Sequence, residues 1–410
     1  YKFHADYAAL DGFDPEHNPV PVEQRPTLDR WILSRLASTA TNYHADFVGW
    51  NFHKACRDLE EFVVNDLSNW YVRRSRRRLW DDAESTDKLA CQHTLHEVLT
   101  TVCKLMAPVS PFMVDIIHRN LTGETVHQAS WPLGVPGTLE GATADSWGLD
   151  AAAATAELPP QDLDLEASMA LVRELAEVGR RIRVDAGRRQ RLPCAQGWIV
   201  AGPDLADFHD ILAEELNVEA IEVEQDLDRF QRIELAPNFR ALAPKARANV
   251  NAVANEIKAS QDPEALLAAI EAGTCEIMGI QIEMSDVELK RAEREGFAAS
   301  TVQTGQGDEA SHISLVLDMN DTPALLSKGL ARDITRRIQA KRKTLNMEIE
   351  ATIDLEIWMK DAPELFDEDQ QWIVNETRCA AAAFHPTDVQ APADADSFEV
   401  DGITVWFAVS

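Results

Sequence analysis

Apolar residues recur every three or four positions through the first third of the chain, which is the spacing of amphipathic helices. The pattern predicts four helices, over about 27–47, 51–80, 85–106 and 110–121. Ser85 or Thr86 is a suitable N-cap for the third helix, and Ser110-Pro111 suits the start of the fourth. Helices joined by loops this short pack as an antiparallel bundle. We therefore expect an all-α bundle over residues 27–132.

The second predicted helix changes character along its length. Asn51 is a suitable N-cap, and the stripe that follows is apolar: Phe52, Ala55, Cys56, Leu59, Phe62, Val63, Leu67, Trp70 and Tyr71. One turn further, the same stripe reaches Arg74 and Arg78. The face that is apolar at the start is therefore predicted to be cationic at the end, where the helix should extend out of the bundle.

After residue 165 the pattern alternates between helix and strand. Helices are predicted from 165 to about 182, up to about 216, over 262–273, from Thr322-Pro323 onward, and through Trp372 and Ile373. Strands are predicted at 198–200, 218–223, 280–284, 313–317 and 349–359, followed by an Asp401-Gly402 hairpin. The fold class is thus a multidomain one, with an all-α helix bundle followed by α/β (α+β) modules at 165–295 and 296–410.

Two stretches lack these periodicities. Residues 1–26 are rich in turn residues and proline, and we expect an extended N-terminal segment there. Residues 133–164 are acidic and rich in Gly, Ala and Pro, as flexible linkers or insertions are.

At 410 residues and 45% hydrophobic content, the chain is large enough for two or three domains with real cores. It begins at Tyr1 rather than Met, so we expect a fragment of a longer protein. No run of about 18 uncharged apolar residues occurs and the N-terminus lacks a signal-peptide layout, so a cytoplasmic location with no membrane contact is expected.

The charge balance is strongly acidic. Asp and Glu number 69 against 39 Lys and Arg, for a formal net charge of −30. Such an excess is typical of adaptation to molar salt, where a Debye length of about 3 Å screens self-repulsion. The periodic helices exclude an acidic disordered protein. Because high salt weakens phosphate contacts, stacking and base-edge contacts should carry more of any nucleic-acid recognition.

Several kinds of chemistry have no signature here. The six cysteines form no C-x-x-C pair, no Gly-rich phosphate loop occurs, and His, Asp and Ser residues show no triad spacing. We therefore expect no catalytic residue, no metal and no bound cofactor within this chain.

The strongest functional signal is an arginine cluster. Five arginines fall within the six consecutive positions 73–78, flanked by three aromatic residues. Guanidinium groups and aromatic planes together suit phosphate contact and base stacking on RNA. The alternative is a solvated charge run paired with Asp66, Asp81, Asp82 and Glu84, and the residues alone leave both interpretations open. The candidate RNA-binding residues are Trp70, Tyr71, Arg73, Arg74, Arg76, Arg77, Arg78 and Trp80.

The segment SNWYVRRSRRRLW (68–80) is similar to a signature of isoleucyl-tRNA synthetases, at the end of a helix in their anticodon domain. LDRWILSRL (28–36) resembles the first helix of that domain, and GLARDITRRIQAKRK (329–343) is characteristic of the same family. RLP (191–193) and EELNV (214–218) resemble the archaeal and eukaryotic type of these synthetases. One small departure from the family is Ala243, since a glycine is common before the following Pro-Lys pair. The resemblance covers nearly all of the chain outside 133–165.

The resemblance implies the anticodon-binding and C-terminal part of such an enzyme, from a halophilic archaeon. The complete enzyme would use ATP and Mg²⁺, with Zn²⁺ in its catalytic part, to charge tRNA with isoleucine and to edit valine. No HIGH-like or KMSKS-like sequence is present, so this fragment would not carry out the catalysis itself. The resemblance implies a monomer whose partner is isoleucine tRNA and not DNA. The aromatic residues of the cluster would stack on anticodon bases, and its arginines would hold phosphates or base edges.

Two further basic runs are candidates for secondary RNA contact: Arg180, Arg181, Arg183, Arg188, Arg189 and Arg191, and Arg336, Arg337, Lys341, Arg342 and Lys343. For both runs the alternative interpretation is a helix face that forms salt bridges, with Glu174, Glu177 or Asp333 as partners, and the residues alone do not decide between the two. Rival functions are the equivalent region of a valyl- or leucyl-tRNA synthetase, although residues 72–76 suit the isoleucine enzyme better, and a non-enzymatic RNA-binding or scaffold module.

Overall fold

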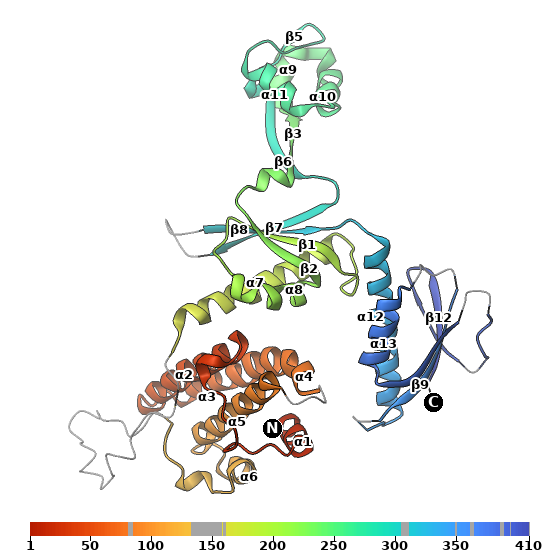
Figure 1. Cartoon of the computed structure of the whole chain (residues 1–410). Helices are drawn as coiled ribbons and strands as arrows, with labels where there is room; N and C mark the ends of the chain where they lie inside the picture. Colours follow the sequence, from red (N-terminus) through yellow and green to blue (C-terminus); the bar gives the residue numbers. More distant parts are fainter. Residues whose placement is uncertain are drawn as a thin grey trace. The chain divides into compact units, whose positions relative to one another are not determined.

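The computed structural model describes residues 1–80, 85–132, 158, 161–304, 311–348, 351–360, 365–385, 389–393 and 395–409. The chain divides into two compact units, Tyr1–Leu171 and Val172–Ser410 (Figure 1). The division falls within helix α7 (Leu163–Asp185). The expected linker at 133–164 lies almost entirely outside the described residues.

Every regular element described in the first unit is helical. The predicted helices appear as α2 (Thr27–Val48), α3 (Phe52–Glu61) continuing through η2 (Phe62–Val72) into α4 (Arg73–Trp80), α5 (Thr86–Met106) and α6 (Pro111–Thr122). Two short 3₁₀ turns, η1 (Val22–Gln24) and η3 (Val126–Gln128), complete this unit. Ser85 accepts a hydrogen bond from the Lys88 amide, which confirms it as the N-cap of α5.

The expectation of an extended segment over residues 1–26 is wrong for its first part. Helix α1 (Lys2–Asp11) forms there and ends at Gly12, whose φ of 62° is left-handed. His4 is buried beside Phe13, with ring centroids 5.8 Å apart, and Asp11 accepts hydrogen bonds from Lys88 Nζ and Gln92 Nε2 at 2.7 and 2.6 Å. These contacts with α5 stabilise a helix that the turn-rich flanking sequence obscured.

The centre of the second predicted helix is a π-helix. In η2 the buried residues recur every four to five positions, as the wider i→i+5 turn requires: Phe62, Asp66, Leu67, Trp70 and Tyr71. This change of period rotates α4, so that Ser75 and Leu79 face the core. The predicted stripe through Arg74 and Arg78 is therefore displaced, and both arginines are half-buried at its edge.

The second unit begins with an α/β module whose strands follow α7 along the chain. Its strands are β1 (Cys194–Val200), β2 (Val218–Glu224), β7 (Phe297–Thr304) and β8 (Ser311–Asp318), with α8 (His209–Leu216) between β1 and β2 after the short 3₁₀ turn η6 (Ala206–Phe208). The sheet order is β2-β1-β8-β7, with β1 parallel to β2 and antiparallel to β8. The sheet therefore draws strands from both predicted modules, 165–295 and 296–410.

A smaller subdomain is inserted between β2 and β7. The 3₁₀ turn η7 (Leu227–Arg229) leads into β3 (Gln231–Pro237), which pairs antiparallel with β6 (Val287–Glu293). Between these strands lie α9 (Phe239–Ala246), η8 (Arg247–Asn249), α10 (Val250–Lys258), α11 (Pro263–Glu271), β4 (Glu276–Ile277), β5 (Ile280–Gln281) and η9 (Met284–Asp286). The strand predicted over 280–284 is thus wrong beyond Gln281, because the capping box between Glu283 and Asp286 bends the chain into η9.

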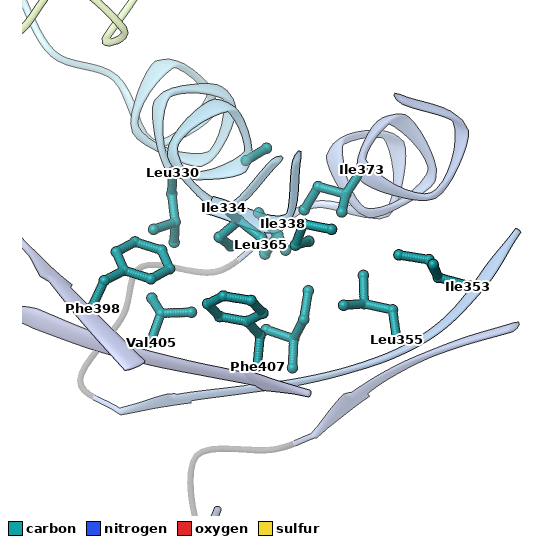
Figure 2. Packing of buried hydrophobic residues seen from close by; sticks show 12 residues of the cluster. Leu330, Ile334, Ile338, Ile353, Leu355, Leu365, Ile373, Phe398, Val405 and Phe407 are labelled. Atoms are coloured by element: carbon teal, nitrogen blue, oxygen red, sulfur yellow. The ribbon is translucent and has the colours of Figure 1, made fainter. Parts of the chain in front are cut away.

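The C-terminal module consists of α12 (Pro323–Thr344), β9 (Ile353–Lys360), α13 (Asp367–Glu376), β10 (Cys379–His385), β11 (Asp396–Val400) and β12 (Ile403–Val409). Leu330, Ile334 and Ile338 of α12 pack on the sheet against side chains that include Phe398 and Phe407 (Figure 2). Asp401 and Gly402 both have positive φ between β11 and β12, which confirms the predicted hairpin.

The two sheet modules have the same design. In each, a long helix precedes a strand, a short helix, a parallel strand and an antiparallel pair, and the order β2-β1-β8-β7 corresponds to β10-β9-β12-β11. A left-handed residue closely follows each short helix: Asn217 comes directly after α8 and Arg378 comes two residues after the end of α13, both with φ of 52°. The second unit therefore contains an internal structural repeat, with the β3–β6 subdomain inserted in its first copy.

Candidate nucleic-acid interface

Three arginines of the cluster at 73–78 face solvent. Arg73, Arg76 and Arg77 are exposed and occupy positions i, i+3 and i+4, so they share one side of α4. Arg73 Nε donates to the Asn69 carbonyl at 2.9 Å, which fixes the base of its guanidinium. We call these three residues the α4 cationic face. Within the described part of the chain, Arg76 has neither a hydrogen bond nor an ion pair.

Two of the predicted stacking residues are buried. Trp70 and Tyr71 are 5% and 0% exposed, because η2 turns both rings inward. The Arg73 and Arg74 guanidinium groups lie over the Trp70 ring at 5.5 and 5.8 Å. The Tyr71 hydroxyl donates to Asp29 Oδ1 at 2.7 Å, and burial raises the pKa of this phenol well above its usual value. Neither ring is therefore accessible for stacking on a base. Trp80, the third predicted stacking residue, is half-buried.

Arg78 belongs to the interior network rather than to the cationic face. Its two terminal nitrogens donate to Asp29 Oδ1 and Oδ2 at 2.6 and 2.8 Å, and its Nε donates to Asp87 at 2.9 Å. Burial opposes the charge on Arg78, but the hydrogen bonds and charge of Asp29 outweigh it and raise the pKa. This bidentate pair joins the ends of α2 and α4, which accounts structurally for one of the five arginines.

The run at 180–191 is mostly committed to contacts within the second unit. Arg183 is 1% exposed and donates to main-chain carbonyls, so its predicted RNA contact is not available in this structure. The others pair with carboxylates: Arg180 with Glu177 and Glu215, Arg188 with Asp321, Arg189 with Asp333 and Asp401, and Arg191 with Asp333. Arg181 is exposed, and it donates to Ser300 Oγ at 3.3 Å.

The run at 336–343 is divided in the same way. Arg342 is buried and donates to the carbonyls of Thr377 and Ala351, while Lys341 pairs with Asp396 at 2.9 Å. Arg336, Arg337 and Lys343 are exposed, and the Arg337 guanidinium lies over the Phe398 ring. The salt-bridged interpretation thus describes most of both secondary runs, because arginines there fix helices to neighbouring elements.

Among the residues whose placement is described, no group of three or more His, Cys, Asp or Glu side chains is arranged to hold a metal ion. Burial raises the pKa of the Cys91 and Cys103 thiols to about 11, which keeps both protonated and unreactive. No helix in the described ranges is long and apolar enough to cross a membrane.

The sequence analysis missed the most exposed aromatic side chains. Trp50, in the turn between α2 and α3, is 81% exposed, and Phe112, at the start of α6, is 85% exposed. Trp50 was not singled out, and Phe112 was assigned with Met113 and Ile116 to the apolar stripe of the fourth predicted helix, which these exposures contradict. For Trp50 the available signal was a large aromatic residue placed directly in a Gly-Trp-Asn turn.

Comparison with known protein families indicates the class of domain that contains the arginine cluster. Residues 29–196 match a family model described as the anticodon-binding domain of tRNA ligase. This range begins within α2, includes α3 to α6 and therefore contains the α4 cationic face.

The relatives are isoleucine–tRNA ligases. The chain is 33% identical to isoleucine–tRNA ligase 2 of Bacillus cereus (strain ZK / E33L) over 363 residues, which are 87% of this chain and 32% of that protein. It is 34% identical to the enzyme of Streptomyces avermitilis over 88% of this chain and 32% of the relative. It is 30% identical to that of Natronomonas pharaonis over 93% and 35%, respectively. The chain thus spans about a third of the relatives' length, and its similarity to isoleucine–tRNA ligases extends over most of its own.

Proposed function

We propose that this chain is the tRNA-binding portion of an isoleucine–tRNA ligase. The observation that carries the proposal is the match of residues 29–196 to the anticodon-binding domain of tRNA ligases, within a similarity that covers 87% of the chain. ATP-dependent charging of tRNA with isoleucine and editing of valine, with Mg²⁺ and Zn²⁺, belong in this proposal to other parts of a longer protein. The chain itself contributes RNA binding.

The α4 cationic face is the element we assign to the RNA backbone. Arg73, Arg76 and Arg77 are exposed on one side of this helix. The rest of the chain, with its net charge of −30, would repel a polyanion in low salt, so a local positive surface is needed for RNA to bind. Guanidinium groups suit phosphate oxygens because they present two parallel donors. Arg181, Arg336, Arg337 and Lys343 are the exposed remainder of the secondary runs and are candidates for weaker backbone contact.

The finer parts of the proposal rest on composition and on the relatives. All the relatives described above are isoleucine enzymes, which favours isoleucine tRNA over valine or leucine tRNA. The 69 acidic residues against 39 basic ones favour a protein that works in high salt, and so a halophilic archaeal source. We further propose a cytoplasmic monomer.

The test is a binding titration of the whole chain with isoleucine tRNA and with valine tRNA, from moderate to molar KCl. Circular dichroism at each salt concentration establishes that the protein is folded. We expect tighter binding of isoleucine tRNA, and we expect this preference to survive in high salt. Equal and steeply salt-sensitive binding of both tRNAs would reduce the function to a generic phosphate patch, and no binding by the folded chain would refute the proposal.

A further inference from the structure

The helices of the first unit place two turns at the same end of the bundle. At one end, Arg78 at the close of α4 contacts both Asp29 in the first turn of α2 and Asp87 in the first turn of α5. Because these helices alternate in direction, the α2–α3 turn and the α5–α6 turn lie at the opposite end (Figure 1). The cationic face of α4 belongs to the first end, and the two turns form the second.

This second end carries a group of exposed apolar side chains. We call it the aromatic end, with the following members and exposed fractions: Val48 43%, Trp50 81%, Phe52 41%, Val109 52%, Phe112 85% and Met113 55%. Trp50 and Phe112 are the two most exposed large hydrophobic residues of the described chain. Exposed large apolar side chains gathered at one end of a helix bundle mark an interaction surface.

The exposed Trp50 ring is anchored to the core by a series of aromatic contacts. Trp50 meets Phe52 edge-on, with centroids 5.6 Å apart, and Phe52 meets Phe47 edge-on at 4.7 Å. Phe47 in turn stacks on Tyr43 at 5.5 Å, and Tyr43 is fully buried. An ion pair between Lys54 and Asp46 at 2.6 Å closes the same turn. The indole is thus held in place while most of its surface stays open.

The backbone conformation of this turn indicates that a tryptophan at position 50 has a functional role. Its φ of 63° is left-handed, a conformation that a bulky residue adopts only under constraint. Gly49 and Asn51, which tolerate that conformation best, flank Trp50 but have φ of −74° and −92°. The left-handed position is therefore occupied by the residue least suited to it, and its side chain projects into solvent.

We propose that the aromatic end binds unpaired bases of a tRNA anticodon loop, with Trp50 as the principal stacking platform and Phe112 as a second one. The inference rests on the proposed function and replaces Trp70 and Tyr71, whose rings are buried, as the base-stacking residues. Both turns lie within the range 29–196 that matches the anticodon-binding family. Stacking on an indole is tolerant of base identity, and as a contact between uncharged rings it depends less on salt than phosphate contacts do, which suits a chain of this acidity.

The position of the cationic face agrees with this arrangement. Phe52 and Arg73 are 21 residues apart along nearly continuous helix, or about 30 Å. One RNA that contacts both surfaces would extend over this distance, with phosphates at Arg73 and unpaired bases at Phe52 and Trp50, and an anticodon arm has this form. Arg57, which is exposed one turn from the aromatic end and has no ion pair among the residues described, is placed for a phosphate of the loop.

The experiment measures the affinity of the whole chain for isoleucine tRNA, and for an anticodon stem-loop with 2-aminopurine in its loop. The variants are Trp50→Ala, Trp50→Phe and Phe112→Ala, and Phe239→Ala is the matched control, since Phe239 is 47% exposed in the second unit. We expect Trp50→Ala to weaken binding by about 5-fold to 150-fold, to the same extent at moderate and molar KCl, and to abolish the quenching of 2-aminopurine. Trp50→Phe should retain most of the affinity, and Phe239→Ala should bind as the wild type does.

The possible outcomes separate this inference from the proposed function. If the wild-type chain binds tRNA and Trp50→Ala and Phe112→Ala bind equally well, the inference is overturned while the proposed function stands. If the folded wild-type chain does not bind, both fall. If the variants leave tRNA affinity unchanged but convert a dimer to a monomer by light scattering, the aromatic end is an interface between copies and the inference is also overturned. Melting temperatures establish that each variant is folded.

Discussion

Arg183 on α7 and Arg342 on α12 occupy equivalent positions in the two sheet modules. Arg183 donates to the Leu216 carbonyl at 3.0 and 2.7 Å, where α8 ends. Arg342 donates to the Thr377 carbonyl at 3.0 Å, where α13 ends. Each buried guanidinium satisfies carbonyl groups that the helix itself leaves unpaired and joins a long helix to a short one. Burial lowers the pKa of both groups, and neither has a carboxylate partner among these contacts.

Substitution of Arg183 by Met should therefore destabilise the first sheet module strongly. The variant leaves several buried carbonyls without donors, and hydrogen bonds to charged groups contribute about 1.5–3 kcal/mol each. We expect a loss of roughly 3–5 kcal/mol in the free energy of unfolding, measured by urea denaturation. Arg181→Met, on the same helix but exposed, is the control and should change stability by less than about 0.5 kcal/mol. Equal effects of the two substitutions would contradict the capping role.

Arg78 and Arg76 provide a matched pair that separates structure from RNA binding. Arg78→Ala leaves the buried Asp29 carboxylate with the Tyr71 hydroxyl but without its charged partner, so we expect a loss of about 3–5 kcal/mol in stability. Arg76→Ala should leave stability within about 0.5 kcal/mol of the wild type. For RNA the order reverses: Arg76→Ala should reduce the slope of log affinity against log salt by about one, as loss of a phosphate contact does.

The measurements for this pair are urea denaturation and tRNA titration at several KCl concentrations, with Arg78→Ala titrated only where it is folded. An unchanged salt slope in Arg76→Ala would exclude that residue from the phosphate contacts. A stable Arg78→Ala variant would show that the Asp29 pair contributes little to the bundle.

His4 should make the stability of the first unit depend on pH. Burial, then the charges of His96 and the N-terminal amine, lower the pKa of His4 from 6.5 to about 4. The unfolded chain therefore binds this proton more readily than the folded one. The stabilisation is complete above about pH 6.5 and is lost as the pH falls toward 4, by roughly 2–4 kcal/mol in total.

The appropriate comparison for this effect is His4→Phe, which retains an aromatic ring beside Phe13. Burial also lowers the pKa of His93 and His96, so the wild type and the variant share their contribution. We expect the difference in melting temperature between the two proteins to change between pH 7 and pH 4, in favour of the variant at acid pH. A constant difference would show that α1 leaves α5 before His4 titrates.

Gly179 gives a prediction whose sign depends on tertiary structure. In an isolated helix, Ala in place of Gly is stabilising by roughly 0.5–1 kcal/mol. In α7, a Cβ at residue 179 would lie 2.0 Å from Leu216 Cδ2 and 3.3 Å from Leu315 Cδ2, both in the core. We therefore expect Gly179→Ala to destabilise the chain by about 1–3 kcal/mol in urea unfolding. Glu174→Ala, at an exposed position of α7, is the control, and a stabilised Gly179→Ala would show that α8 moves away freely.

Periodicity alone predicted most elements of this fold, because a long amphipathic helix or an alternating strand repeats its signal many times. The helices α2, α5 and α6 and the Asp401-Gly402 hairpin appear where they were expected. Helix α1 was missed because its apolar residues do not form one buried stripe, His4 being its buried residue, and because its stability comes from contacts with α5. The β1–β8 pairing was also missed, since strands far apart in sequence carry no mark of their partner.

For the candidate site, the sequence by itself determined the kind of chemistry: an arginine cluster with aromatic neighbours, in a chain that resembles a tRNA ligase. Only the tertiary structure decided which of these side chains are accessible. The π-helical turn of η2 rotates Trp70 and Tyr71 into the core, and Asp29, brought close by the folding of α2, takes Arg78. Trp50 and Phe112 gain their meaning only in the fold, because two turns that are distant in sequence lie at one end of the bundle. Accessibility depends on neighbours across the fold, and a sequence pattern reports only the neighbours along the chain.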